Sequence, residues 1–258
     1  MAGTAAPRFL VGVLGGMGPL ATVDFLAKLV AATPAEGDAD HVPFVAASIP
    51  QIPSRVAAIL HGGDSPLPAL VDARDRLLAA GATLLAMPCN TAHRWHAELA
   101  RGIEAPFLHI ADAAVAEVAA RVAPGATVGV VATDATRAIR LYSARLEGAG
   151  YRVAEPRDAA DLETVARGIA GVKRGEAAAG GRHFARVVAS LERAGAAAIV
   201  LGCTEIPPGL AAAGVDAGVP WVDPTDALAR ACAGAWARVR AASGGRRAPA
   251  LDKAGPPP

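Results

Sequence analysis

Short apolar runs alternate with longer amphipathic segments along almost the whole chain. Residues 9–14, 83–87 and 127–132 are continuous apolar runs bounded by glycine or polar residues, which is typical of strands buried on both faces of a sheet. Residues 21–32 and 68–80 have apolar positions at helical spacing. Strands that alternate with helices in this way predict an α/β architecture with parallel sheets.

The remaining segments follow the same pattern. Further strands are expected at residues 41–48, 107–110, 151–154, 196–201 and 219–222. Further helices are expected near residues 94–101, 111–122, 138–149, 162–172 and 184–194, with a last one from 224 to about 242. Residues 243–258 are rich in Gly, Arg, Ala and Pro, and we expect them to be a disordered tail.

One stretch of the chain occurs twice. The segment from Gly81 to Cys89 aligns with the segment from Gly195 to Cys203: in each, a glycine opens an apolar run and a cysteine follows eight residues after it. Gly12 and Gly129 hold matching places in the strands that open the two halves. Ligands of parallel sheets bind beyond the carboxyl ends of the strands. Two halves that face each other about a pseudo-twofold axis would therefore oppose the two cysteines across a cleft.

The repeat divides the chain into two α/β domains. We expect an N-terminal domain of residues 1–112, completed by residues 219–242, and a second domain of residues 113–218. A chain of 258 residues has room for two domains of roughly 110 residues each.

Composition limits the classes of binding partner and the cellular compartment that we expect for this protein. The formal net charge is +1 and the basic residues are scattered, so nothing favours nucleic acid or an anionic membrane surface as a partner. Three cysteines form an odd set at low density, which fits free thiols in a reducing cytosol. The N-terminal residues lack the basic and long apolar regions of a secretory signal, and no apolar run is long enough to span a bilayer. We therefore expect a cytoplasmic protein.

A glycine-rich turn follows the first predicted strand. Gly15-Gly16-Met17-Gly18-Pro19 joins that strand to a helix, and backbone amides in such a turn suit an anion. The pattern also matches a dinucleotide fingerprint, but Ser48 and Ile49 stand where the supporting acidic residue should follow the next strand. We favour a substrate carboxylate and assign Met17 and Gly18 to substrate binding.

Two of the three cysteines are candidates for catalysis. A single buried cysteine is more often packing than chemistry, and Cys232, on the apolar side of a helix, fits that role. Cys89 and Cys203 differ because each follows a strand end, adjoins hydrogen-bonding residues and matches the other through the repeat. Zinc held by these two cysteines and His93 is the competing interpretation. Two opposed thiols suit proton transfer at a carbon acid, since one removes the α-proton while the other returns a proton to the opposite face.

Ionisation of these thiols needs hydrogen-bond donors or positive charge, because a free cysteine titrates at about pH 8.5. Thr91, Thr204 and neighbouring amides are candidate donors. Arg55 lies where a helix begins after the second strand, and the helix dipole slightly disfavours a cation there. That misfit indicates a role in binding an anion.

Three motifs carry a family resemblance. GVLGGMGP at residues 12–19, MPCNTAH at 87–93 and LGCTEIP at 201–207 resemble motifs of the cofactor-independent aspartate/glutamate racemase family, most of all its aspartate racemase branch. The resemblance spans Gly12 to about Trp236. It implies two pseudo-symmetric flavodoxin-like domains with the active site in the cleft between them. It also implies amino-acid racemisation without pyridoxal phosphate or metal, and a homodimer.

The same resemblance implies roles for single residues. Cys89 and Cys203 would be the acid/base pair, and Arg55 and Lys173 would bind the distal carboxylate of aspartate. Glu205 would support Cys203 through its surroundings or serve as a structural hydrogen-bond acceptor. Five residues would bind the α-carboxylate: Asn90, Thr91, Thr133, Thr136 and Thr204.

One departure from the family pattern concerns Ala135, which stands where a glycine is usual, so we expect a differently shaped turn there. The sequence predicts racemisation of aspartate, with glutamate as the second choice. Four alternatives stay open: a two-cysteine maleate isomerase, a hydantoin racemase, a non-catalytic dicarboxylate-binding protein and a redox-sensing dithiol protein.

Overall fold

A computed structural model describes residues 9–242 of the chain. The predicted disordered tail, residues 243–258, lies outside the described residues. No helix in the described range combines the length and the apolarity needed to cross a membrane.

The first sheet contains three parallel strands in the order β2-β1-β3. These strands are β1 (Val11–Gly15), β2 (Phe44–Ser48) and β3 (Leu84–Ala86). A parallel bridge between Leu85 and Phe107 adds a fourth position beyond β3. The helices of this half are α1 (Pro19–Ala31), α2 (Arg55–Leu60), α3 (Leu67–Ala79), α4 (His96–Ala100) and α5 (Ile110–Ala119), with short 3-10 turns at Asp38–Asp40 and Thr91–Trp95.

The second sheet contains four parallel strands in the order β5-β4-β6-β7. They are β4 (Thr127–Ala132), β5 (Arg152–Ala154), β6 (Ala198–Gly202) and β7 (Trp221–Val222). Both sheets therefore begin from a central strand and add the second and third strands on opposite sides, as in flavodoxin-like doubly wound folds. The helices of this half are α6 (Asp134–Ala138), α7 (Ser143–Gly148), α8 (Ala159–Lys173), α9 (Ala177–Arg193) and α10 (Ile206–Ala212). The last helix, α11 (Pro224–Ala242), follows β7 and contacts α1 and α5. The predicted α/β class with parallel sheets is confirmed.

Packing around Gly12 and Gly129 repeats residue by residue in the two halves. A Cβ atom at Gly12 would lie 2.7 Å from side chains of Ala82 and Leu85 and 3.2 Å from Leu77. A Cβ atom at Gly129 would meet Ile199, Leu191 and Ala196 at 3.0 to 3.4 Å. These are the residues that the sequence repeat pairs with Leu85, Leu77 and Ala82. In each half, the missing side chain lets the helix before the third strand approach the central strand closely.

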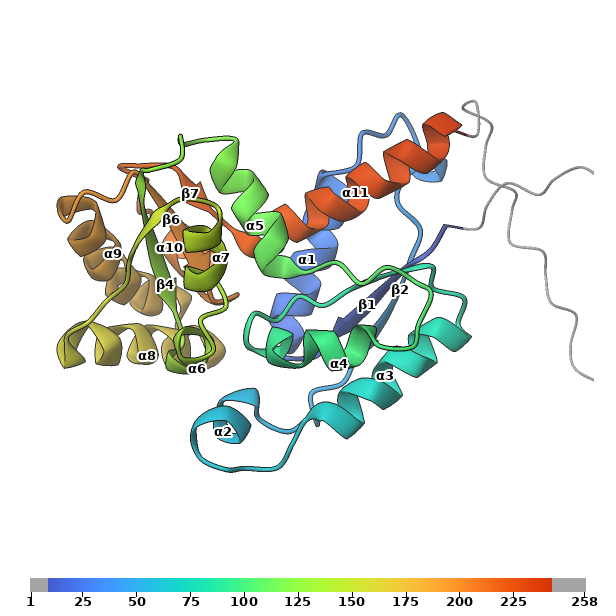
Figure 1. Ribbon diagram of the computed structural model, residues 1–258, viewed down its shortest axis with the longest axis horizontal. Coiled ribbons are helices and arrows are strands. Elements are labelled where there is room, and N and C mark those ends of the chain that lie inside the picture. The colour runs from blue at the N-terminus through green and yellow to red at the C-terminus, as the bar shows by residue number, and fades with distance from the viewer. Residues whose placement is uncertain (1–8, 243–258) are drawn as a thin grey trace, which may run out of the picture.

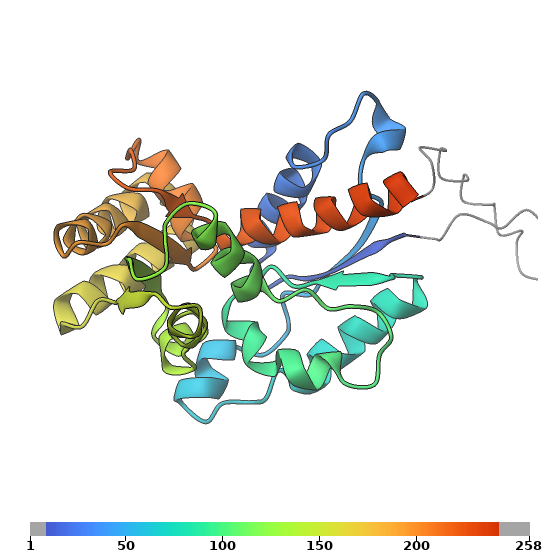
Figure 2. The same ribbon diagram turned by 45° about the horizontal axis from the view of Figure 1, so that its top comes forward.

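The two sheets lie on either side of a shared layer of helices (Figures 1 and 2). One hydrophobic core joins residues from both halves, among them Val11, Phe25, Val130, Tyr142 and Trp236. Separate cores lie on the outer faces, under α3 for the first sheet and under α8 and α9 for the second. Because alternate residues of a strand point to opposite faces, Val130 faces the shared core while Val131 faces the outer one.

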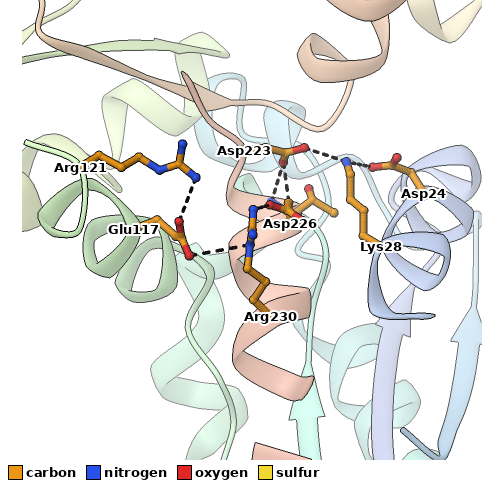
Figure 3. Close-up of polar contacts among 8 residues, drawn as sticks. Asp24, Lys28, Glu117, Arg121, Asp223, Asp226 and Arg230 are labelled. Atoms are coloured by element: carbon orange, nitrogen blue, oxygen red, sulfur yellow. Dashed lines mark hydrogen bonds and ion pairs between the residues drawn. The ribbon is translucent and has the colours of Figure 1, made fainter. Parts of the chain in front are cut away.

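Charged pairs hold the helices of the shared layer together (Figure 3). Lys28 on α1 bonds to Asp24 one turn earlier and to Asp223, just before α11, at 2.7 Å. Asp223 also accepts from the backbone N–H of Thr225 at 2.8 Å, which satisfies a free donor at the start of α11. The elements that connect the halves are thus fixed by both apolar and ionic contacts.

Residues 219–242 do not belong to one half, although the sequence assigned them all to the first. β7 pairs with β6 in the second sheet, whereas α11 packs along α1 of the first half and also contacts α5 (Figure 2). The sequence lacks a signal for this division because β7 contains two residues and its pairing depends on a contact distant in the chain.

Two predicted helices have different bounds in the structure. The helix expected at residues 138–149 is reduced to α7, because α6 already ends at Ala138 and Arg140 between the two helices has a φ of +52°. The helix expected from residue 184 begins at Ala177, because Gly180 and Gly181 allow close contact between helices instead of ending one. The strand expected at 107–110 is reduced to the single bridge at Phe107.

Candidate active site

A pocket with a volume of about 70 Å³ lies between the halves, at the carboxyl ends of their strands. The first half supplies residues from the turn after β1, the start of α2 and the turn after β3, and the second half supplies the start of α6, the end of α8 and the turn after β6. The lining residues are Met17, Ser54, Arg55, Val56, Cys89, Asn90, Thr91, Thr133, Lys173, Cys203, Thr204 and Glu205. Its size suits a small metabolite rather than a dinucleotide.

The two pocket cysteines occupy equivalent turns. The N–H of Cys89 donates to the carbonyl of Met87 at 2.8 Å, and the N–H of Cys203 donates to the carbonyl of Leu201 at 2.9 Å. Both side chains are almost fully buried, and both sulfurs are free thiols. The repeat seen in the sequence therefore gives two matching thiols, one from each half, at one pocket.

Cys89 lies beside positive charge. Burial raises the pKa of the Cys89 thiol above its ordinary value, and the Glu205 carboxylate acts in the same direction. The Arg55 guanidinium and the backbone N–H of Ala92 oppose this by stabilising the thiolate.

Cys203 lies beside negative charge. Its Sγ donates to Glu205 Oε2 at 2.9 Å, and Thr204 Oγ1 donates to the same oxygen at 3.1 Å. The pKa of the Cys203 thiol is raised well above its ordinary value by burial and then by this carboxylate. The backbone N–H of Glu205 and then Lys173 Nζ, 3.8 Å from Glu205 Oε1, lower this pKa. The two thiols are thus alike in backbone geometry, and the pKa of Cys203 is raised more than that of Cys89.

Three threonine hydroxyls meet where the halves touch. Thr91 Oγ1 lies 2.9 Å from Thr136 Oγ1 and 3.4 Å from Thr133 Oγ1. Thr133 is the N-cap of α6, where its oxygen accepts from the N–H of Thr136 at 3.1 Å and its hydroxyl donates to Thr136 Oγ1 at 2.9 Å. This network orients the Thr91 and Thr133 hydroxyls that line the pocket.

Arg55 is held by backbone carbonyls and keeps one donor unused. Its Nη1 donates to the carbonyls of Ile52 and Pro53 at 3.0 Å, and Nη2 donates to the carbonyl of Met17 at 3.4 Å. Its buried Nε has no hydrogen-bond partner within the described part of the chain. Ser54 caps α2 by accepting from the N–H of Ala57 at 3.2 Å, so the helix start fixes the arginine at the pocket. A partly buried cation whose buried Nε–H is unpaired suits an anionic ligand.

Asn90 is positioned by Tyr142, a residue that no sequence motif indicated. The Tyr142 hydroxyl donates to Asn90 Oδ1, and the buried Asn90 Nδ2 has no partner among the described residues. Burial raises the pKa of the Tyr142 phenol well above its usual value, so the hydroxyl stays a donor at neutral pH. Tyr142 reaches Asn90 because the chain breaks between α6 and α7.

The glycine-rich turn serves packing more than phosphate binding. The N–H of Gly16 donates to Thr22 Oγ1 at 2.8 Å, and a Cβ at Gly16 would lie 2.2 Å from the backbone nitrogen of Ile49. Gly16 is thus used for a close approach of two backbone segments. This arrangement removes an amide that a dinucleotide pyrophosphate would need.

The environment of His93 argues against the zinc interpretation. Its Nδ1 lies 2.9 Å from the carbonyl oxygen of Cys89, and its Nε2 accepts from the N–H of Ile110 at 3.1 Å. Both ring nitrogens are therefore engaged away from the thiols. Over residues 9–242, no group of three or more His, Cys, Asp or Glu side chains is arranged to hold a metal ion.

Two further residues can be compared with the sequence predictions. Cys232 lies fully buried on α11, and burial raises the pKa of its thiol to about 12, as expected for a packing residue. Ala135 is a buried residue inside α6 and does not have a positive φ. The turn that was expected to differ in shape is part of helix α6, where alanine carries no conformational penalty.

The structure brings most of the predicted site residues together. Ten of the twelve line the pocket, whereas Gly18 and Thr136 do not. Thr136 instead supports Thr91 and Thr133 from behind. Ser54 and Val56 line the pocket without having been predicted, although their position next to Arg55 was a signal for both.

Comparison with known proteins places these observations in a family. A family model described as Asp/Glu/hydantoin racemase matches residues 14–232. A broad-specificity amino-acid racemase of Bacillus subtilis is 29% identical over 148 residues, which are 56% of this chain and 63% of that protein. The aligned part thus spans less than two thirds of that relative.

Solved structures extend the comparison to the fold. An aspartate racemase of Picrophilus torridus superposes with a TM-score of 0.78 and 29% identity, over 89% of this chain and 95% of that chain. An aspartate racemase homologue from Pyrococcus horikoshii superposes with a TM-score of 0.69 and 22% identity, over 89% of this chain and all of the other. The second likeness concerns the fold alone.

Proposed function

The chain belongs to the Asp/Glu/hydantoin racemase family, and on that premise we propose that it is a cofactor-independent racemase of aspartate, with glutamate as second substrate. The observation that carries the proposal is one pocket with two thiols on matching turns of opposite halves. Arg55 and Lys173 at the same pocket add the positive charge that a second carboxylate requires.

Proton transfer would proceed between the two sulfurs. One thiolate takes the proton from the α-carbon, so that its S–H bond forms as the C–H bond breaks and the electron pair stays on the substrate. The other thiol then gives its proton to the opposite face of that carbon and becomes the thiolate. The enzyme ends with its proton on the other cysteine, and the substrate ends with inverted configuration.

The remaining pocket residues would hold the substrate for this exchange. The Thr91 hydroxyl and the unpaired amide of Asn90 are donors for the α-carboxylate. The hydroxyls of Thr133 and Thr204 would join them by turning from Thr136 and Glu205 toward the substrate. Hydrogen bonds to that carboxylate strengthen as negative charge spreads onto it during deprotonation, so they stabilise the carbanion more than the ground state. Arg55 Nε and Lys173 Nζ would bind the distal carboxylate. Thr136 would act only through its hydrogen bonds to Thr91 and Thr133.

Aspartate and asparagine together test the proposed specificity, because they have nearly the same shape and differ in the distal charge. Racemisation of each enantiomer would be followed by circular dichroism without added cofactor, next to glutamate and alanine. We expect aspartate to exceed asparagine in kcat/KM by about 100-fold, which corresponds to the loss of a charged hydrogen bond of about 1.5–3 kcal/mol. Equal turnover of asparagine and alanine would instead indicate broad specificity, as in the name of the Bacillus relative.

Two other activities make different predictions in the same assays. A maleate isomerase would leave the optical rotation of aspartate unchanged and convert maleate, and a hydantoin racemase would act on hydantoins. A non-catalytic dicarboxylate-binding protein would bind aspartate without changing it. The homodimer belongs to this proposal, and light scattering coupled to gel filtration tests it.

A further inference from the structure

Matching backbone turns place a different charged side chain next to each thiol: Arg55 acts most strongly on Cys89 and Glu205 on Cys203. Cys203 donates to a carboxylate oxygen of Glu205 at 2.9 Å, a contact for which Cys89 has no counterpart. Glu205 is itself buried, with about 9% of its surface exposed, so its charge is weakly screened. A carboxylate accepts hydrogen bonds and donates none, which means that the Cys203 contact exists only while the sulfur keeps its proton.

The surroundings of Cys89 disfavour its thiolate less strongly, although burial raises the pKa of this thiol too. Arg55 from α2 and the backbone N–H of Ala92 stabilise negative charge on this sulfur, and Glu205 is its unfavourable neighbour. Around Cys203 are the Glu205 carboxylate, Lys173 at the end of α8 and the Tyr142 hydroxyl. The backbone N–H of Glu205 stabilises negative charge on Cys203 as that of Ala92 does on Cys89, so the two sites differ in their charged side chains. Lys173 is about half exposed and lies 3.8 Å from the other Glu205 oxygen, so it offsets the carboxylate only in part.

We propose that Glu205 makes the two cysteines inequivalent. It accepts a hydrogen bond from the Cys203 thiol, so that Cys203 keeps its proton while Cys89 is the thiol that ionises first. The inference rests on the proposed two-base function and adds a starting state to it. Cys89 is the base and Cys203 the acid in the first half of the cycle. Glu205 is a positioning residue, since it acts on substrate only through Cys203.

The inequivalence of the two thiols affects how each enantiomer is turned over. The resting protein binds productively the enantiomer whose α-proton faces Cys89, and turnover leaves a Cys203 thiolate next to the Glu205 carboxylate. Repulsion between these charges favours return of the proton to Cys203. Since free enantiomers have equal free energies, kcat/KM must be the same in both directions. The asymmetry therefore appears in the pH at which each thiol ionises. It also appears as different kcat and different KM values for the two enantiomers, with the ratio kcat/KM unchanged.

Peptide-resolved alkylation tests the inference without any substrate. The full chain would be treated briefly with iodoacetamide at a series of pH values, and mass spectrometry would read Cys89 and Cys203 separately, with buried Cys232 as internal reference. The variants are Glu205→Gln, which keeps an acceptor but removes the charge, and Glu205→Asp, which keeps the charge. Glu163→Gln on the surface of α8 is the matched control, because it removes an exposed carboxylate that does not line the pocket.

We expect Cys89 to react at a lower pH than Cys203 in the unaltered protein. In Glu205→Gln, alkylation of Cys203 at neutral pH should rise at least about tenfold, which is the increase in thiolate for a fall of one pKa unit. Glu205→Asp should retain most of the protection and Glu163→Gln all of it. Circular dichroism spectra would establish that each variant is folded.

Two results would overturn the inference. One is the same pH midpoint for both cysteines, and the other is an unchanged Cys203 profile in folded Glu205→Gln. Neither depends on racemase activity: a protein that fails to racemise aspartate can still show the predicted thiol asymmetry. Conversely, an active racemase with two equivalent thiols would refute only the role of Glu205.

Discussion

Replacing Gly181 by alanine tests how tightly α9 packs against α10, the helix that begins just after Glu205. A Cβ atom at residue 181 would lie 1.9 Å from the carbonyl oxygen of Gly209, about 1.5 Å short of the 3.4 Å at which ordinary contact begins. The obstructing atoms belong to the backbone of α10, so no side-chain rotation relieves the clash. The two helices must move apart.

The magnitude follows from two opposing effects. Overpacking a well-ordered interior costs about 1–3 kcal/mol. Alanine recovers about 0.5–1 kcal/mol relative to glycine within a helix. We expect Gly181→Ala to lower the free energy of unfolding by about 1–2 kcal/mol, which for a chain of this size lowers Tm by about 2–8 °C. Urea unfolding, compared at equal m-value, measures the change directly.

Gly234→Ala is the matched control. Residue 234 also lies inside a helix, but the nearest atom to its added Cβ is the mobile tip of Arg238 at 3.6 Å. This variant should gain about 0.5–1 kcal/mol, the opposite sign for the same substitution. If Gly181→Ala proved as stable as Gly234→Ala, the close contact between α9 and α10 would be wrong. A destabilised Gly181→Ala should also lose activity, since α10 follows the Cys203 turn.

Three further predictions concern the pocket and its supports. Arg55→Lys keeps a positive charge but loses the planar guanidinium donors. Steady-state kinetics should show kcat/KM for aspartate reduced about 10- to 100-fold and kcat/KM for asparagine little changed. An equal loss for both substrates would mean that Arg55 does not recognise the distal carboxylate. Tyr142→Phe leaves the buried Asn90 oxygen unpaired and should cost about 1–3 kcal/mol in urea unfolding, with retention of full stability as the opposing result. Burial holds the pKa of His93 well below its usual 6.5. Below about pH 6.5 the unfolded chain therefore binds a proton at this residue that the folded chain does not bind. The free energy of unfolding should fall as the pH decreases from there, by at most about 1.4 kcal/mol per pH unit for this residue. Urea unfolding at pH 7 and pH 5 checks this, and His93→Gln should show the shallower decline.

Much of the fold could be predicted because its signals are local. The apolar runs that become β1, β4 and β6 are buried on both faces, and the pairing of Gly12 with Gly129 follows from a repeat visible in the sequence. The repeat also predicted that Cys89 and Cys203 would reach one pocket, since strands of parallel sheets end on one side.

The remaining features depend on contacts that the sequence does not display. Gly180 and Gly181 look like helix breakers, yet they lie inside α9 because α8 and α10 pack against their bare backbone. The break before Tyr142 lies at Arg140, whose φ of +52° no periodicity predicts. For the same reason, the hydrogen bond between Tyr142 and Asn90, two residues far apart in the chain, was not foreseen.

Exchange of the α-proton in deuterated buffer, followed by NMR, tests the two-thiol proposal most directly. L- and D-aspartate would each be incubated with the protein and with the Cys89→Ser and Cys203→Ser variants, without added cofactor. We expect the unaltered protein to replace the α-proton of both enantiomers with inversion, and each variant to lose inversion while retaining at most exchange of one enantiomer. Inversion that survives either substitution would contradict the two-base mechanism, and absence of exchange from both aspartate and glutamate would contradict the proposed racemase activity.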